Sequence, residues 1–147
     1  MKPFQLDRVL DHKKRLEDIT ANRLFEAKRQ EKLVKKKLSE KIRHLKSTIE
    51  KTEKLQTQTI PILDLINYEN QIQYMKNTIL AIKKKLQEKT AAVEREYLSL
   101  IEKSKNRQIL ESLKEQQNRS WKQYLDKQEN SVLDEIAITK HEEKTEL

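Results

Sequence analysis

Apolar side chains recur every seven residues between Leu65 and Leu100, with a second apolar position three residues after several of them. The full set is Leu65, Tyr68, Ile72, Met75, Ile79, Ile82, Leu86, Val93 and Leu100. Steps of three and four residues place these side chains on one narrow stripe of a helix, and the other faces are polar. Because a stripe of this length needs a partner helix to bury it, the pattern predicts a coiled-coil helix from about residue 64 to about residue 140.

A weaker apolar stripe precedes it. Its members are Leu6, Leu10, Leu16, Leu24, Ala27, Val34, Leu38, Ile42, Leu45, Ile49 and Leu55. Polar residues interrupt the stripe at Lys13, Thr20 and Glu31, and two four-residue steps in succession from Val34 to Ile42 mark a local slip of the heptad. The pattern predicts a first helix from about residue 4 to about residue 57.

One break separates the two stripes. Residues 56–60 carry no charge and include two threonines, and Pro61 follows them. Since proline ends a helix and restricts the residue before it, we expect a bend at about residues 58–63. Two helices joined by a short connection lie antiparallel, so the predicted fold is all-α: a two-helix antiparallel coiled-coil hairpin with a longer second helix, in a single domain over residues 1–147.

The longer second helix is expected to extend past the first one. Trp121, Leu125, Val132 and Ile136 form one apolar stripe in this extension, flanked by Tyr124 and Leu133. An apolar stripe without an intramolecular partner favours docking to a different protein. Self-association and a fold-back of the last helix remain alternatives.

The composition limits the chemistry. The 147 residues include no glycine and no cysteine, which excludes glycine-rich phosphate-binding loops and disulfides. His12, His44 and His141 are far apart in sequence, and the adjacent acids Asp134 and Glu135 diverge on a helix. We therefore expect no catalytic residues, no metal site and no cofactor. No apolar run reaches the roughly 20 residues that span a bilayer, and the opening residues do not resemble a secretory signal.

The formal net charge of +8 lies in the first part of the chain. Residues 1–60 hold 17 Lys and Arg against 9 Asp and Glu. The densest basic cluster comprises Arg29, Lys32, Lys35, Lys36, Lys37, Lys41, Arg43 and Lys46. A solvated helix face is the favoured interpretation, followed by an acidic protein or anionic lipid headgroups. Nucleic acid is disfavoured because the cluster has no aromatic residues for base stacking.

Tyr74 lies beside the stripe of the second helix, close to Gln71, Met75 and Thr78. An exposed tyrosine next to a methionine favours adaptable protein contact. An equally good interpretation is that these residues only cover the seam.

Both ends of the chain show a family resemblance. The opening segment, residues 4–10 with Lys14 to Glu17, resembles the start of the FliJ family of flagellar export proteins. Residues 110–115, the spaced Trp121 and Tyr124, and residues 133–137 resemble its C-terminal half. One departure is that the family is usually rich in arginine after the acidic pair, where this chain has lysine and histidine mixed with glutamate.

The resemblance implies a non-enzymatic stalk and adaptor of flagellar type III export. The implied partners are the hexameric export ATPase, the membrane export gate protein and the export chaperones, with no nucleic acid. The implied gate-binding residues are Gln71, Tyr74, Met75 and Thr78. The implied ATPase-ring residues are Phe4, Leu6, Val9, Leu10, Trp121, Tyr124, Leu125, Val132 and Ile136.

We expect the protein to be monomeric when free. It would be cytoplasmic and peripheral at the inner face of the cell membrane, at the base of the flagellum. A stalk protein of a virulence-type secretion system, or a coiled-coil scaffold or dimer without an ATPase partner, remains an alternative.

Overall fold

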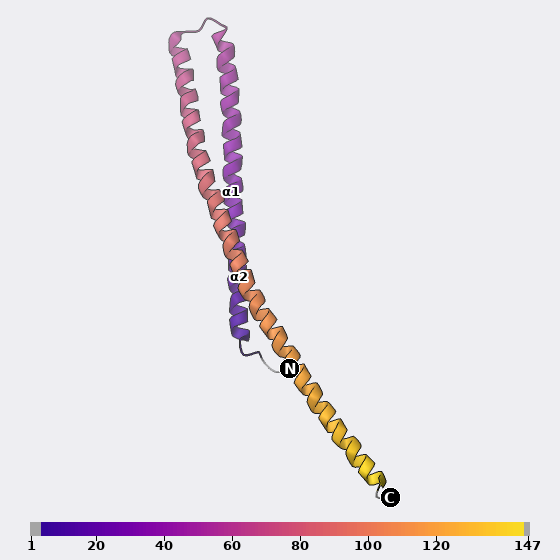
Figure 1. The fold of residues 1–147 in the computed structure, drawn as a ribbon. Helices are drawn as coiled ribbons and strands as arrows, with labels where there is room; N and C mark the ends of the chain where they lie inside the picture. Colours follow the sequence, from indigo (N-terminus) through magenta and orange to yellow (C-terminus); the bar gives the residue numbers. More distant parts are fainter. Residues whose placement is uncertain (1–3, 146–147) are drawn as a thin grey trace. The chain divides into compact units, whose positions relative to one another are not determined.

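The computed structural model describes residues 4–145, which form two helices and contain no strand (Figure 1). Helix α1 comprises Asp7–Gln56, with 50 residues, and helix α2 comprises Ile62–Thr145, with 84 residues. The predicted fold class, an all-α hairpin with a longer second helix, is therefore confirmed.

Local chemistry sets the ends of both helices. Asp7 lies in the first turn of α1, where its negative charge faces the positive end of the helix dipole. At the other end, the carbonyl oxygen of Lys54 accepts two hydrogen bonds from Thr57, one of 2.7 Å from its hydroxyl and one of 3.3 Å from its backbone N–H. Pro61 then precedes α2, and its carbonyl accepts hydrogen bonds from the backbone N–H groups of Asp64 and Leu65.

The helices contribute to two compact units. Residues 18–101 form unit 2, which contains the connection and the paired parts of α1 and α2 on either side of it. Residues 4–17 and 102–145 form unit 1, which contains the beginning of α1 and the C-terminal part of α2.

The seam of unit 2 contains the apolar stripe that the sequence predicts for α2. All nine of its residues are buried or half-buried, and Ile79 and Ile82 are the most deeply buried. On α1 the buried residues of this unit are Leu24 and Val34 together with three threonines, Thr20, Thr48 and Thr52.

The prediction that Thr20 interrupts the seam of α1 was wrong, because its side chain is only 4% exposed. Thr48 and Thr52 show how a helix can bury threonine. Each hydroxyl donates to the backbone carbonyl of the residue four positions earlier, at 2.9 Å for Thr48 and 2.8 Å for Thr52. With the hydroxyl paired locally, such a side chain behaves as a small apolar residue.

Unit 1 is held together differently. Phe4 and Leu10 are buried, but Leu6, which the sequence assigns to the stripe, is exposed. Across the two helices, the Arg107 guanidinium pairs with the Glu17 carboxylate, and it also donates a 2.7 Å hydrogen bond to Glu111. A second ion pair joins Lys114 and Asp7 at 2.9 Å.

Candidate functional site

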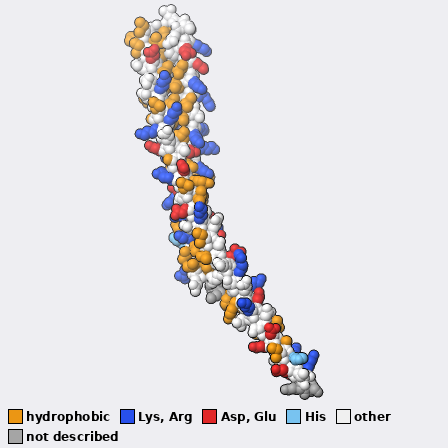
Figure 2. All heavy atoms as spheres, viewed as in Figure 1, with side chains coloured by type: hydrophobic (Ala, Val, Ile, Leu, Met, Phe, Trp, Pro, Cys, Tyr) orange, Lys and Arg blue, Asp and Glu red, His pale blue; other side chains and the backbone are white. Residues whose placement is uncertain are grey.

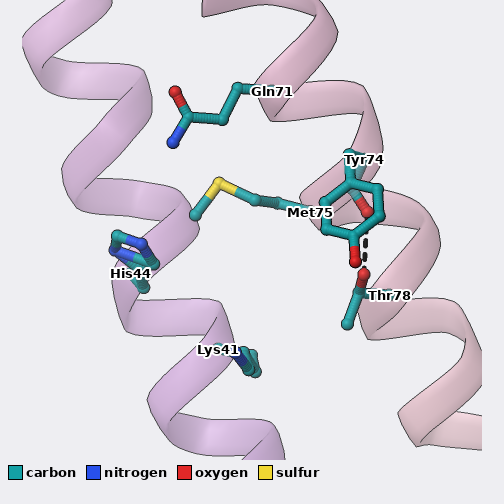
Figure 3. Close-up of a pocket in the computed structure, with 6 residues that line it drawn as sticks. All are labelled: Lys41, His44, Gln71, Tyr74, Met75 and Thr78. Carbon is teal, nitrogen blue, oxygen red and sulfur yellow. Dashed lines mark hydrogen bonds between the residues drawn. The ribbon is translucent and has the colours of Figure 1, made fainter.

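A groove crosses the surface of unit 2 where α1 and α2 face each other (Figure 3). We call it the seam groove and define it by Lys41 and His44 of α1 and by Gln71, Tyr74, Met75 and Thr78 of α2. Its volume is about 220 Å³. This space can hold one or two side chains of a partner, and it is too small for most complete ligands.

The groove lies where the seam of α1 lacks an apolar residue. Leu38 and Leu45 are half-buried seam residues one heptad apart, and regular spacing places an apolar residue at position 41 between them. That position holds Lys41, which is exposed, while the neighbouring Ile42 is half-buried instead. Because no apolar side chain fills the seam at position 41, the two helices leave an opening there.

The side chains of the groove combine apolar and polar groups. Met75 points from α2 towards α1 and ends near His44, and the amide of Gln71 also points towards α1 (Figure 3). The Thr78 hydroxyl donates to the Tyr74 carbonyl at 3.0 Å, so it is already paired within the helix. Tyr74 is 73% exposed at the rim. The groove can therefore receive an apolar side chain against Met75 and an acidic or carbonyl group near Lys41.

The structure brings together all four residues that the resemblance assigned to gate binding. Sequence reasoning missed the α1 side of the groove, Lys41 and His44. The available signal was the charged Lys41 at the seam position between Leu38 and Leu45, where heptad spacing calls for an apolar residue.

A second candidate surface is the C-terminal part of α2. Every residue in 122–145 is exposed, and hydrophobic side chains are visible on this part of the helix in Figure 2. Leu125, Val132 and Ile136 lie on one stripe of it. Trp121 is half-buried at the start of the stripe and stacks on Tyr124, with 5.4 Å between the ring centroids.

The N-terminal residues assigned to the ATPase ring divide into two pairs. Phe4 and Leu10 are buried, which gives them a packing role in unit 1. Leu6 and Val9 are 40% and 41% exposed and remain accessible to a partner. The structure thus leaves Leu6 and Val9 available on α1 and the stripe available on α2.

Residues 4–145 contain neither a metal-binding cluster of side chains nor a helix that could cross a membrane. No three His, Asp or Glu side chains of this part of the chain are grouped so that they could bind a metal ion. Neither described helix contains a stretch that is apolar over the length needed to cross a membrane.

Comparison with known families identifies the relationship. A family model described as Flagellar FliJ protein matches residues 1–146. The chain belongs to the FliJ family. This membership confirms the family resemblance and associates the chain with flagellar type III export. No curated protein and no solved structure matches the chain.

Proposed function

We propose that this FliJ-family chain is the stalk and adaptor of the flagellar export apparatus. In this proposal, the end of the hairpin that contains unit 1 inserts into the ring of the export ATPase and stimulates it. The seam groove binds the membrane export gate protein, and the chain also binds export chaperones. The protein acts without chemistry of its own, is monomeric when free and works in the cytoplasm at the base of the flagellum.

The observation that carries the proposal is the exposed stripe of α2. Leu125, Val132 and Ile136 are each about half exposed in a segment where no residue is buried. Exposed aliphatic surface gains roughly 25 cal/mol per Å² when a partner covers it. The apolar stripe of such a helix can pack against the inner wall of a ring into which the helix inserts.

The seam groove supports a separate contact. It belongs to unit 2, whereas the stripe belongs to unit 1. Its mixed lining of thioether, phenol and cationic groups suits a protein segment with one apolar and one acidic side chain. Two chemically different surfaces in two units fit an adaptor that holds two partners at once.

A pair of double variants tests both assignments. The variant L125D/I136D places two carboxylates on the stripe, and we expect it to reduce stimulation of the purified export ATPase at least tenfold, because each charge would be buried in the ring. Its matched control, Q123D/N130D, adds charges of the same sign to the opposite face of the same helix and should keep full stimulation. Circular dichroism must show unchanged helix content in both.

The second variant, Y74A/M75A, addresses the groove. We expect it to weaken binding to the export gate protein about tenfold in a titration while ATPase stimulation persists, and L125D/I136D should show the reverse. Full stimulation by folded L125D/I136D would reject the stalk assignment. If that variant instead converts a dimer into a monomer in sedimentation, the coiled-coil scaffold becomes the better explanation.

A further inference from the structure

The side of α1 that faces away from the seam in unit 2 is strongly basic. Residues 28–46 contain nine Lys and Arg but only two Glu, a net charge of +7. Phe25, Arg29, Lys32, Lys36 and Arg43 follow one another at steps of four, three, four and seven residues, so they share one stripe of the helix, and all are exposed. With Leu33, which flanks this stripe, we call them the basic face.

Little of this charge is neutralised within the protein. Arg29 pairs with Glu26 at 2.7 Å, and hydrogen bonds from Arg29 and Gln30 lower the pKa of Glu26 to about 2. Among the residues that the structure describes, Lys32, Lys36 and Arg43 have no ion-pair partner. The uncompensated positive charge of the basic face therefore comes mainly from these three residues.

The fold adds charge from α2 at the same level. Lys41 and Thr78 line one groove, which fixes how the two helices are aligned. Since the helices are antiparallel, each step back along α1 from Lys41 corresponds to a step forward along α2 from Thr78. Residues 35–37, all lysine, thus lie level with residues 82–84, which include Lys83 and Lys84. In the view of Figure 2, Lys and Arg side chains gather along this paired part of the hairpin.

The basic face also exposes apolar groups among its cations. Phe25 is 72% exposed and Leu33 is 51% exposed. Cations interspersed with an exposed aromatic and an aliphatic residue are typical of helices that bind in the plane of a membrane interface. The side of a helix is convex, so it can lie on a flat surface but cannot enclose a peptide. One aromatic residue provides no row of stacking platforms for nucleic-acid bases.

We propose that the basic face binds side-on to the surface of an anionic phospholipid bilayer. Lys32, Lys36 and Arg43 contact the headgroups, while Phe25 and Leu33 enter the interfacial layer. Binding of this kind needs no membrane-spanning segment and is independent of the proposed contacts with the ATPase and the gate. It would concentrate the free protein at the membrane before it meets its partners.

Vesicle co-sedimentation of the full chain tests the proposal. We expect binding to vesicles of phosphatidylglycerol mixed with phosphatidylcholine, no binding to phosphatidylcholine alone, and a loss of binding at about 1 M salt, where charges are screened within about 3 Å. The variant K32Q/K36Q/R43Q should bind anionic vesicles on the order of 100-fold more weakly, since each cation near the surface contributes about fivefold.

Two further variants identify the surface and the ligand. The control K14Q/K105Q/K122Q removes the same number of charges from unit 1 and should bind like the unaltered chain. Phe25→Ala leaves the net charge unchanged and should weaken vesicle binding several-fold, because it removes an inserted apolar group. An equal loss in the control, or equal binding to neutral vesicles, would overturn the proposal. So would tighter binding to duplex DNA or polyglutamate than to anionic vesicles at the same salt concentration.

Discussion

Ile79 and Leu80 are neighbours in α2 with side chains of equal size and opposite environments. Ile79 is 6% exposed in the seam of unit 2, whereas Leu80 is 64% exposed. Comparing substitutions at these two positions therefore isolates the contribution of side-chain burial to the free energy of unfolding.

Alanine at each of these two positions tests the assigned faces. Ile79→Ala should lower the free energy of unfolding by about 2–4 kcal/mol, because it removes buried methylene and methyl groups and leaves a cavity. Leu80→Ala should change it by less than about 0.5 kcal/mol, as exposed positions usually do. Urea denaturation followed by circular dichroism measures both values. Similar losses from the two variants would show that α2 is rotated relative to the described seam.

At the scale of the helices, α1 and α2 bury different kinds of side chain. The seam of α2 in unit 2 is aliphatic and aromatic, whereas that of α1 includes Thr20, Thr48 and Thr52. Thr48 and Thr52, whose hydroxyls are paired within α1, act in this seam as small apolar residues.

Replacing one of these threonines tests this interpretation. In Thr52→Val the side-chain shape is kept, the hydroxyl is lost, and the Thr48 carbonyl still accepts its helical hydrogen bond. We expect a gain in stability of up to about 1 kcal/mol, whereas Thr52→Ala should cost about 1 kcal/mol through lost packing. Thermal unfolding provides the comparison. A marked destabilisation by valine would mean that the hydroxyl has a partner across the seam.

Most of the fold could be predicted from heptad spacing, because a stripe of Leu, Ile and Val residues at steps of three and four has one way to be buried. The burial of the threonines could not be predicted. A hydropathy scale counts the hydroxyl as polar and ignores its local hydrogen bond to a backbone carbonyl. Likewise, Tyr74 and Met75 were recognisable as a patch from α2 alone. The sequence around Lys41 marks a gap in the α1 seam, but matching Lys41 and His44 to Tyr74 and Met75 required the alignment of two distant segments.

At the scale of the whole molecule, the two units differ in what holds their helices together. Unit 2 has a long and mostly apolar seam. Unit 1 buries Phe4 and Leu10 and adds two ion pairs between its helices, Arg107 with Glu17 and Lys114 with Asp7. The pKa of Arg107 is raised chiefly by its hydrogen bond to Glu17, so the arginine stays charged at any working pH. Ionic contacts weaken in salt, whereas apolar burial does not.

Amide hydrogen exchange can measure the local stability of the helices in each unit separately. Arg107→Gln should speed amide exchange in residues 10–17 about 5- to 30-fold, equivalent to about 1–2 kcal/mol, and leave residues 24–52 of unit 2 unchanged. Arg119→Gln removes an exposed pair within α2, with Glu115, and should have almost no effect. High salt should act on the unaltered chain as Arg107→Gln does. Equal effects on both units would show that the hairpin opens as a single cooperative body.

The short connection at residues 57–61 also determines the order in which parts of α1 and α2 pair during protein synthesis. Seam residues next to it can meet across a small loop, whereas Glu17 and Arg107 are 90 residues apart in the sequence. At ribosomal rates of about 5–20 residues per second, α1 is complete for several seconds before all of α2 has been made. The hairpin should therefore close from the connection outwards while translation continues. The ends that carry the ion pairs come together last, after the seam of unit 2 has already formed.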